Sequence, residues 1–319
     1  MPRSFAWRYV AALAAFFAAS TGAPAAHAEL KVVATIKPIH ALATRVMDGI
    51  GTPRLLVSGT ASPHSFALKP SDARALAEAD IFFRVSEMVE PFTARIVQAL
   101  PATVHVVTLA NAPDLLVLGQ RASGTFEARA HAGHVHETRV PGATPMSGDG
   151  HIWLDPENAK IMVAEMARVL ALRAPEHAVT VRANAATVLA ELDALAAELS
   201  RDLAGVKDRP FVVFDDAYQY FENRFGLNAV GAITLSPEAQ PSAKRLSEIR
   251  RKIAESGAVC VFAEPLFQPR LVAAVTEGTS ARGGTLDPEG VMVEPGPDAY
   301  AKLMRQLASS LKECLQGRI

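Results

Sequence analysis

The sequence predicts an α/β fold of two lobes, each built on a parallel sheet, joined by one long rigid helix. In both halves of the chain, short β-branched runs alternate with longer segments of helical period, as in βα units around a parallel sheet. Between the halves lies a stretch made almost entirely of helix formers. We therefore expect an N-terminal lobe over 29–174, a connecting helix over 175–206 and a C-terminal lobe over 207–319.

The expected strands follow the same rhythm in both lobes. In the N-terminal lobe they are Lys31–Ile36, Arg54–Gly59, Ile81–Ser86 and Val104–Leu109. In the C-terminal lobe they are Phe211–Asp215, Ala229–Leu235, Ala258–Ala263 and a short piece at Gly284–Leu286.

The connecting segment has the pattern of a long helix. Pro175 stands near its start, and apolar residues then recur at helical spacing, at Val181, Val188, Leu192, Leu195 and Leu199. At about 1.5 Å per residue, a helix of this length reaches roughly 45 Å, enough to run along both lobes. An ordinary surface helix inside one lobe is the alternative.

The first 28 residues have the features of an export signal. Arg3 and Arg8 precede an apolar run, and small residues before position 29 predict cleavage after Ala28. An uncleaved anchor is the alternative, although the run is shorter than the roughly 20 apolar residues of a membrane helix. No lipobox cysteine is present. Cleavage would remove two arginines and no acids, which moves the formal charge from −1 to −3 and gives no reason to expect nucleic acid as a partner.

Two further features concern cysteine and histidine. The two cysteines, Cys260 and Cys314, suggest one disulfide in an exported chain, with two separate buried thiols as the alternative. Residues 120–150 lack apolar periodicity and are expected to form a long loop. That loop contains His131, His134 and His136, which suit either a weak metal-collecting arm or a solvated insert.

Four candidate metal ligands each stand in or just after an apolar, strand-like run. They are His64, His151, Asp215 and Asp287. Ligands of open α/β sheets bind outside the carboxyl ends of the strands, so these side chains can converge on one crevice. Each also has an ordinary alternative: a surface histidine for His64, an interdomain hydrogen bond for His151, and a turn-forming aspartate at the other two positions.

The strings around these residues resemble a known family. They are Ser62-Pro-His-Ser-Phe-Ala-Leu-Lys-Pro-Ser-Asp72, His151-Ile-Trp-Leu-Asp-Pro-Glu-Asn-Ala159, Phe214-Asp-Asp-Ala-Tyr-Gln-Tyr-Phe-Glu222 and Gly284-Thr-Leu-Asp-Pro288. Together, and in this order, they resemble the zinc-uptake binding proteins of bacterial ABC importers, the ZnuA-like cluster A-I family.

The resemblance implies a function and a site. It implies a periplasmic monomer that binds Zn²⁺ between two lobes, with His64, His151, Asp215 and Asp287 as ligands, and delivers it to the membrane subunits of an importer. It also implies the disulfide between Cys260 and Cys314, since zinc-type members often carry one.

Asp215 departs from the zinc-type pattern, which has histidine at this position. Two imidazoles and two carboxylates make a harder ligand set that suits Mn²⁺ better than three histidines would. A manganese or mixed-metal binding protein of the same importer class is therefore the first alternative. His40 is a possible second-shell group on the floor of the cleft, although a satisfied hydrogen bond at a helix start is the more ordinary role.

Two other classes of function are weaker. Two histidines and a carboxylate could hold a catalytic zinc, but the chain has no HExxH motif, nucleophile elbow or Gly-rich phosphate loop, so we expect no enzyme. A surface adhesin is the other class, and the export signal without a lipobox favours the periplasm over an anchored surface protein.

Overall fold

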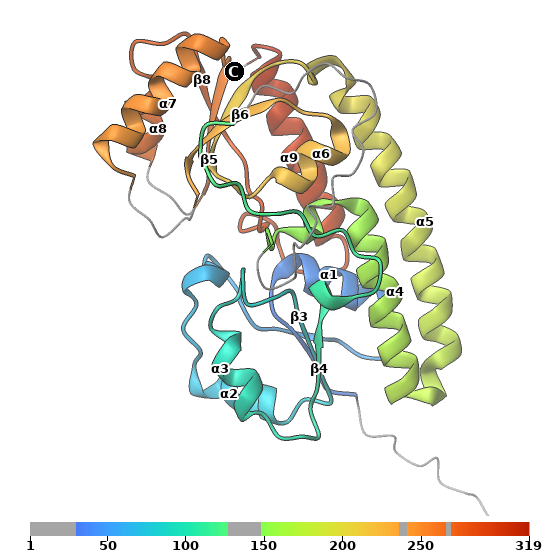
Figure 1. Cartoon of the computed structure of the whole chain (residues 1–319). Helices are drawn as coiled ribbons and strands as arrows, with labels where there is room; N and C mark the ends of the chain where they lie inside the picture. The colour runs from blue at the N-terminus through green and yellow to red at the C-terminus, as the bar shows by residue number, and fades with distance from the viewer. Residues whose placement is uncertain (1–29, 127–147, 236–240, 266–268, 319) are drawn as a thin grey trace, which may run out of the picture.

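The computed structural model describes residues 30–126, 148–235, 241–265 and 269–318. Two lobes lie one above the other, and one long helix runs along one side of both (Figure 1). The predicted α/β fold with two parallel sheets and a connecting helix is confirmed. The expected signal peptide and His131, His134 and His136 lie outside the described residues.

The N-terminal lobe is built on a four-stranded parallel sheet in the order β2-β1-β3-β4. Its central strands β1 and β3 are buried along their whole length, as expected where both faces of a parallel sheet are covered. The strands are β1 (Val32–Ala34), β2 (Arg54–Leu55), β3 (Ile81–Arg84) and β4 (His105–Thr108), and the helices are α1 (Lys37–Val46), α2 (Pro70–Ala77) and α3 (Thr93–Ala99).

The C-terminal lobe repeats this topology. Its four parallel strands have the order β6-β5-β7-β8, so the first strand of each lobe again lies between the second and the third. The strands are β5 (Phe211–Asp215), β6 (Ala229–Thr234), β7 (Cys260–Ala263) and β8 (Arg282–Thr285). The helices are α6 (Gln219–Phe225), α7 (Ala243–Ser256), α8 (Pro269–Thr276) and α9 (Ala299–Leu315).

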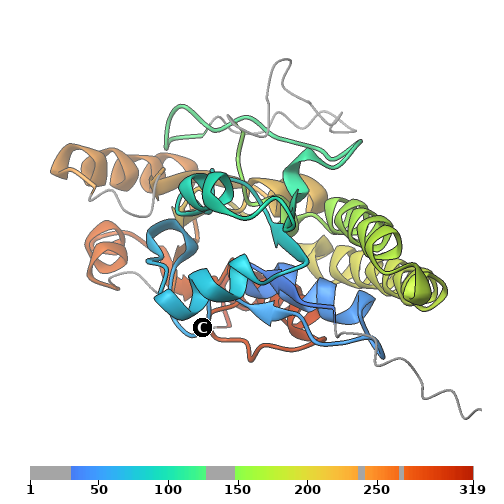
Figure 2. The same ribbon diagram turned by 90° about the horizontal axis from the view of Figure 1, so that it is seen from below.

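The connecting element is α5 (Ala178–Leu203), 26 residues long. It begins three residues later than Pro175, because Pro175–His177 forms a short 3₁₀ turn, and a second such turn covers Ala204–Val206. At about 1.5 Å per residue it is roughly 39 Å long. It packs beside α4 (Pro156–Arg173), as the view from below in Figure 2 also shows.

The apolar face of α5 is the one that the sequence predicted. Its packing partners include α1 from one lobe and α9 from the other, and α1 and α9 also contact each other. One core therefore runs through both lobes. The buried residues of this face are Ala178, Val181, Ala185, Val188, Leu192, Leu195, Leu199 and Leu203.

Part of the expected loop crosses from one lobe to the other. Phe126 N donates to Val230 O at 3.0 Å, and Ala232 N donates to Gly124 O at 2.9 Å, so this segment pairs with the outer edge of β6. A side chain at Gly124 would meet the guanidinium of Arg245 and the carbonyl oxygen of Ala232, which explains a glycine at this close approach.

The predicted disulfide between Cys260 and Cys314 is present and links β7 to α9, with the two Cα atoms 6.2 Å apart.

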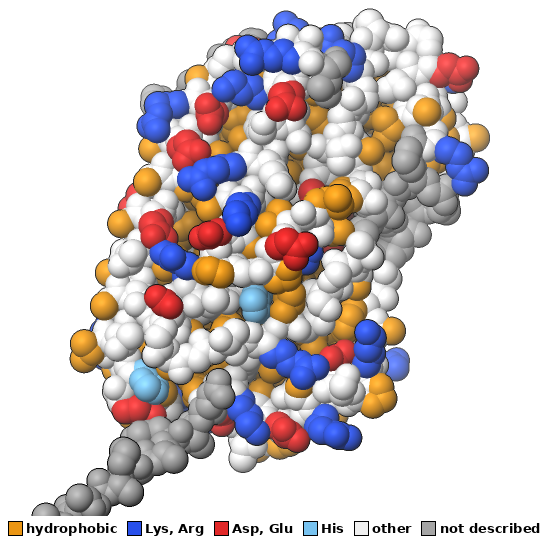
Figure 3. All heavy atoms as spheres, turned by 180° about the vertical axis from the view of Figure 1, so that it is seen from behind, with side chains coloured by type: hydrophobic (Ala, Val, Ile, Leu, Met, Phe, Trp, Pro, Cys, Tyr) orange, Lys and Arg blue, Asp and Glu red, His pale blue; other side chains and the backbone are white. Residues whose placement is uncertain are grey.

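The surface charges are mixed. On the face shown in Figure 3, basic and acidic side chains are interspersed rather than segregated. Among the described helices, none combines the length and the apolar character that a membrane span requires.

Removing the disulfide should destabilise the protein without changing its fold. The bridge closes a loop with a sequence separation of 54, and breaking it should lower the free energy of unfolding by about 2–4 kcal/mol. Urea unfolding with and without reductant measures the difference. The Cys260→Ala/Cys314→Ala variant is the control, since its midpoint should match the reduced protein and not respond to reductant. Equal midpoints for oxidised and reduced wild type would contradict the prediction.

Candidate metal centre between the two lobes

A cleft of about 380 Å³ lies between the lobes, and residues of both line it. Three of the four predicted ligands, His64, His151 and Asp215, are among its lining residues, and Asp287 is not. The remaining lining residues are Met88, Pro91, Gln120, Arg121, Asp149, Gly150, Asp216 and Leu235.

His64 lies in a 3₁₀ turn, Pro63–Ser65, after β2. The Ser62 hydroxyl begins this turn by accepting a hydrogen bond from His64 N at 3.3 Å. The imidazole is 12% exposed, and its centroid lies 5.6 Å from that of His151. The two predicted histidines, 87 residues apart in the chain, therefore face the same small space.

His151 is held by the carboxylate of Asp149. One oxygen, Oδ1, lies 2.7 Å from His151 Nδ1 and accepts from His151 N at 3.0 Å. With Nδ1 engaged as the donor, Nε2 is the ring nitrogen available to a metal, a tautomer inferred from the hydrogen bond. The sequence analysis did not single out Asp149 as a partner of His151. The spacing of two residues between Asp149 and His151 was the signal that could have identified this contact.

Asp149 is itself fixed by the C-terminal lobe. The hydroxyl of Tyr220, on α6, donates to Asp149 O at 2.7 Å and accepts from Leu118 N at 3.0 Å. Gln219 Nε2 donates to Gly119 O at 3.0 Å. The orientation of His151 thus depends on contacts between the two lobes.

The two histidines differ in their affinity for protons. Burial, followed by the neighbouring charge of His151, lowers the pKa of His64 to about 3. Burial acts in the same direction on His151, but the charge and hydrogen bond of Asp149 outweigh it and raise the pKa of His151 to about 9. Near pH 7, His64 is therefore neutral, whereas His151 carries an additional proton that binding of a metal to its ring would displace.

Asp215 stands at the end of β5 and is buried, with 4% of the residue exposed. The next residue, Asp216, accepts from Arg121 at 2.7 Å, and Glu222 accepts from the same guanidinium at 2.6 Å. Arg121 belongs to the segment that crosses from the N-terminal lobe. This buried ion-pair group, which sequence reasoning missed, fixes the C-terminal wall of the cleft.

A second carboxyl group lies behind Asp215. Glu264 is buried, with 8% of the residue exposed, and accepts from the hydroxyl of Tyr218 at 2.8 Å. Burial, followed by the charge of Asp215, raises the pKa of Glu264 well above its usual range. Glu264 is therefore suited to a protonated, neutral state.

Asp287 is engaged in its own loop. Its two carboxylate oxygens accept from Val291 N at 2.9 Å and from Met292 N at 2.8 Å. Two residues further on, Glu289 Oε1 lies 3.8 Å from His64 Nε2, and the Glu289 side chain is 12% exposed. Sequence reasoning did not single out Glu289.

His40 lies away from the cleft lining. Its Nε2 is 2.9 Å from Pro53 O, and burial lowers its pKa. This is the hydrogen bond at a helix start that the sequence offered as the more ordinary role. His40 contributes to the packing beneath β2.

The cleft brings donors near one another without a finished coordination shell. Within the described part of the chain, no three His, Cys, Asp or Glu side chains are close enough to hold one metal ion. The donors that line it, two imidazoles and the carboxylate of Asp215, suit zinc and also tolerate manganese.

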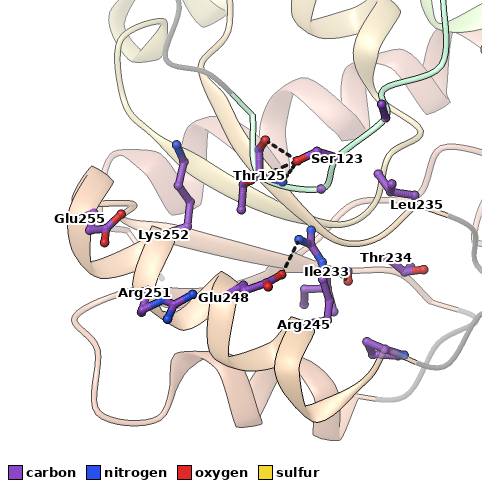
Figure 4. Close-up of a pocket in the computed structure, with 13 residues that line it drawn as sticks. Ser123, Thr125, Ile233, Thr234, Leu235, Arg245, Glu248, Arg251, Lys252 and Glu255 are labelled. Carbon is purple, nitrogen blue, oxygen red and sulfur yellow. Dashed lines mark hydrogen bonds and ion pairs between the residues drawn. The ribbon is translucent and has the colours of Figure 1, made fainter.

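A larger hollow of about 1020 Å³ lies on the C-terminal lobe beside α7 (Figure 4). Charged side chains of both signs line it, including the ion pair of Arg245 and Glu248, with Lys252 nearby. It has no histidine or cysteine among its lining residues, so its chemistry is unlike that of the interlobe cleft.

The chain is similar to zinc-uptake proteins over nearly its whole length. It is 43% identical to the high-affinity zinc uptake system protein ZnuA of Brucella abortus, over 94% of this chain and 96% of that protein. It is 37% identical to the protein of the same name from Paracoccus denitrificans, over 93% and 96% of the two chains.

A solved structure shares the fold. The structure of a mutant laminin-binding adhesin, Lmb, from Streptococcus agalactiae matches with a TM-score of 0.73 and 26% identity, over 90% of this chain and 99% of that one. The family described as zinc-uptake complex component A, periplasmic, matches residues 32–314. The chain therefore belongs to this family of zinc-uptake binding components.

Proposed function

We propose that this protein captures Zn²⁺ in the cleft between its lobes and delivers it to the membrane subunits of an ABC importer. The observation that carries the proposal is a pair of histidines whose ring centroids lie 5.6 Å apart, His64 with a side chain 12% exposed and His151 buried. Asp149 orients His151 in the way that a metal-ligating histidine is oriented. The names of the relatives support zinc as the cargo.

The proposal includes the setting of the protein. Export through a signal peptide cleaved after Ala28 would place a monomer in the periplasm, where the loaded protein would dock on the importer. The family description supports this location. The bound ion is cargo rather than a catalytic group, and we propose no enzymatic turnover.

Within the cleft, His64, His151 and Asp215 are the proposed zinc ligands that line the wall. Asp287, the fourth ligand predicted from the sequence, lies in the loop that follows β8, where its carboxylate accepts from two amides of that loop. Two ligands thus come from the N-terminal lobe and one from the C-terminal lobe, so bound zinc would join the lobes.

Removing any one lining ligand should abolish tight binding. Loss of groups that only orient a ligand typically costs 10–100-fold in metal affinity, so His64→Ala, His151→Ala and Asp215→Asn should each cost more than about 100-fold. Competition titration with a chromophoric chelator measures the affinity, and circular dichroism checks the fold. His105→Ala, which alters an exposed histidine on β4, is the matched control. Wild-type affinity in all three variants would refute the site.

Zinc binding should release about one proton near pH 7, because His151 is charged in the empty protein and His64 is neutral. Between about pH 5 and pH 8 the apparent affinity should rise about tenfold per pH unit, then level off above the pKa of His151. Calorimetry in buffers of different ionisation enthalpy counts the protons. Asp149→Asn should lower the pKa of His151 and reduce the count. Proton release that does not change with pH or with the Asp149→Asn substitution would contradict a protonated His151 in the empty protein.

The metal preference should depend on Asp215. Asp215→His replaces a hard oxygen donor with an imidazole and should widen the margin by which Zn²⁺ binds more tightly than Mn²⁺. Both affinities are measured by competition at one fixed pH. A ratio equal to that of the wild type would mean that Asp215 does not touch the metal. If Mn²⁺ bound the wild type more tightly than Zn²⁺, the manganese alternative would replace the zinc proposal.

The histidines of the loop should act separately from the cleft. We propose that His131, His134 and His136 bind additional zinc weakly and raise its concentration near the cleft. The triple alanine variant should retain the tight site and lose the weaker equivalents, as counted by calorimetric titration. Loss of the tight site in this variant would instead place one of these histidines among its ligands.

A further inference from the structure

The loop that follows β8 is fastened to the N-terminal lobe. The ammonium group of Lys37, at the start of α1, donates to the carbonyl oxygens of Gly290, Val291 and Val293 at 2.9, 2.7 and 3.1 Å. The loop therefore wraps a buried cation that belongs to the other lobe. Residues 37 and 290 are far apart in the chain, so this contact exists only in the folded protein.

A second donor from the N-terminal lobe holds the same loop. Trp153 Nε1 donates to Pro288 O at 2.8 Å. The hydroxyl of Tyr300 in turn donates to the backbone carbonyl oxygen of Trp153 at 2.8 Å and so helps to hold Trp153 in place. Trp153 is fully buried, and its ring centroid lies 5.3 Å from that of His151. The loop is thus fixed against the element that carries His151.

Asp287 stabilises the loop from within. Its two carboxylate oxygens accept the amide hydrogens of Val291 and Met292, which closes the turn. Its charge, together with those of Glu289 and Glu294, also favours the charged form of Lys37, which burial opposes. A carboxylate occupied in this way serves the loop conformation.

Glu289 is the carboxylate of this loop that reaches the histidines. Its Oε1 lies 3.8 Å from His64 Nε2, and both side chains are 12% exposed. Two ligands of one tetrahedral zinc lie about 3.3 Å apart, given metal–ligand distances of about 2.0–2.2 Å. A small rotation of the Glu289 side chain would therefore bring both atoms onto the same ion.

We propose that Glu289 is the second carboxylate ligand of the zinc site, and that Lys37 and Asp287 are positioning residues that hold its loop against His64. This inference rests on the proposed function and refines its ligand set. It makes His64, His151 and Glu289 a group fixed to the N-terminal lobe, with Asp215 approaching from the C-terminal lobe. Asp287, which the sequence favoured, then acts through Glu289.

The test compares isosteric variants of the two acids. Glu289→Gln should weaken Zn²⁺ binding at least tenfold in competition titration, while the unfolding midpoint of the metal-free protein stays near that of the wild type. Asp287→Asn should lower that midpoint, because one amide of the turn loses its acceptor. Glu277→Gln, at an exposed position, is the matched control. Wild-type zinc affinity in Glu289→Gln would overturn the inference.

Double variants test the positioning roles. If Lys37 and Asp287 act through Glu289, adding Lys37→Met or Asp287→Asn to Glu289→Gln should weaken zinc binding no further than Glu289→Gln does. A merely structural role would not produce this coupling. Should Lys37→Met fail to fold, the Asp287 pair carries the test. Full additivity of Asp287→Asn and Glu289→Gln would make Asp287 an independent contributor and overturn its assignment.

His64→Ala in the same titration separates this inference from the proposed function. Loss of zinc binding in His64→Ala together with wild-type affinity in Glu289→Gln would remove Glu289 from the site and leave the zinc function standing. Wild-type affinity in both variants would overturn the cleft site and the inference together. Loss in both supports both.

Discussion

The Asp149 carboxylate joins the orientation of His151 to the contact between the lobes. One carboxylate oxygen of Asp149 accepts from the ring and from the backbone amide of His151. The backbone carbonyl oxygen of Asp149 accepts from the hydroxyl of Tyr220, in the opposite lobe. Asp155 makes a similar connection between the lobes. Its carboxylate accepts from Glu157 N at the start of α4 and from two nitrogens of the Arg224 guanidinium group, on α6 of the C-terminal lobe. The histidines therefore keep their geometry only while the lobes stay in register.

Much of the fold could be predicted because buried parallel strands appear in the sequence as short, continuous apolar runs. β1, β3 and β5 are short apolar runs buried on both faces, and α5 shows its buried face at regular spacing. Elements at the edges of the sheets have a weaker sequence pattern. β2 has two residues, and the segment at Gly124–Phe126 pairs with β6 through backbone groups, which no side-chain pattern reports.

Three of the four candidate ligands predicted from the sequence line one cleft. His64 lies in the loop after β2 and Asp215 ends β5, so the carboxyl ends of two parallel strands do meet at the cleft. His151 instead stands directly before the 3₁₀ turn Ile152–Leu154 that leads into α4. The loop after β8 is different, because its backbone folds around Lys37 from the other end of the chain. The sequence singled out Asp287, whose carboxylate accepts from amides of its own loop, and gave no sign of Glu289, whose Oε1 lies 3.8 Å from His64 Nε2.

The pairing of Gly124–Phe126 with β6 has a consequence for self-association. β6 is an outer strand of its sheet, and an open edge of this kind is a template on which other chains can add strands. Here a segment of the N-terminal lobe occupies part of that edge, with hydrogen bonds to Val230 and Ala232. Residues about a hundred positions earlier in the chain thus protect the edge of the C-terminal sheet against edge-to-edge aggregation. A fragment that lacks these residues would expose the edge of β6 to pairing with other chains.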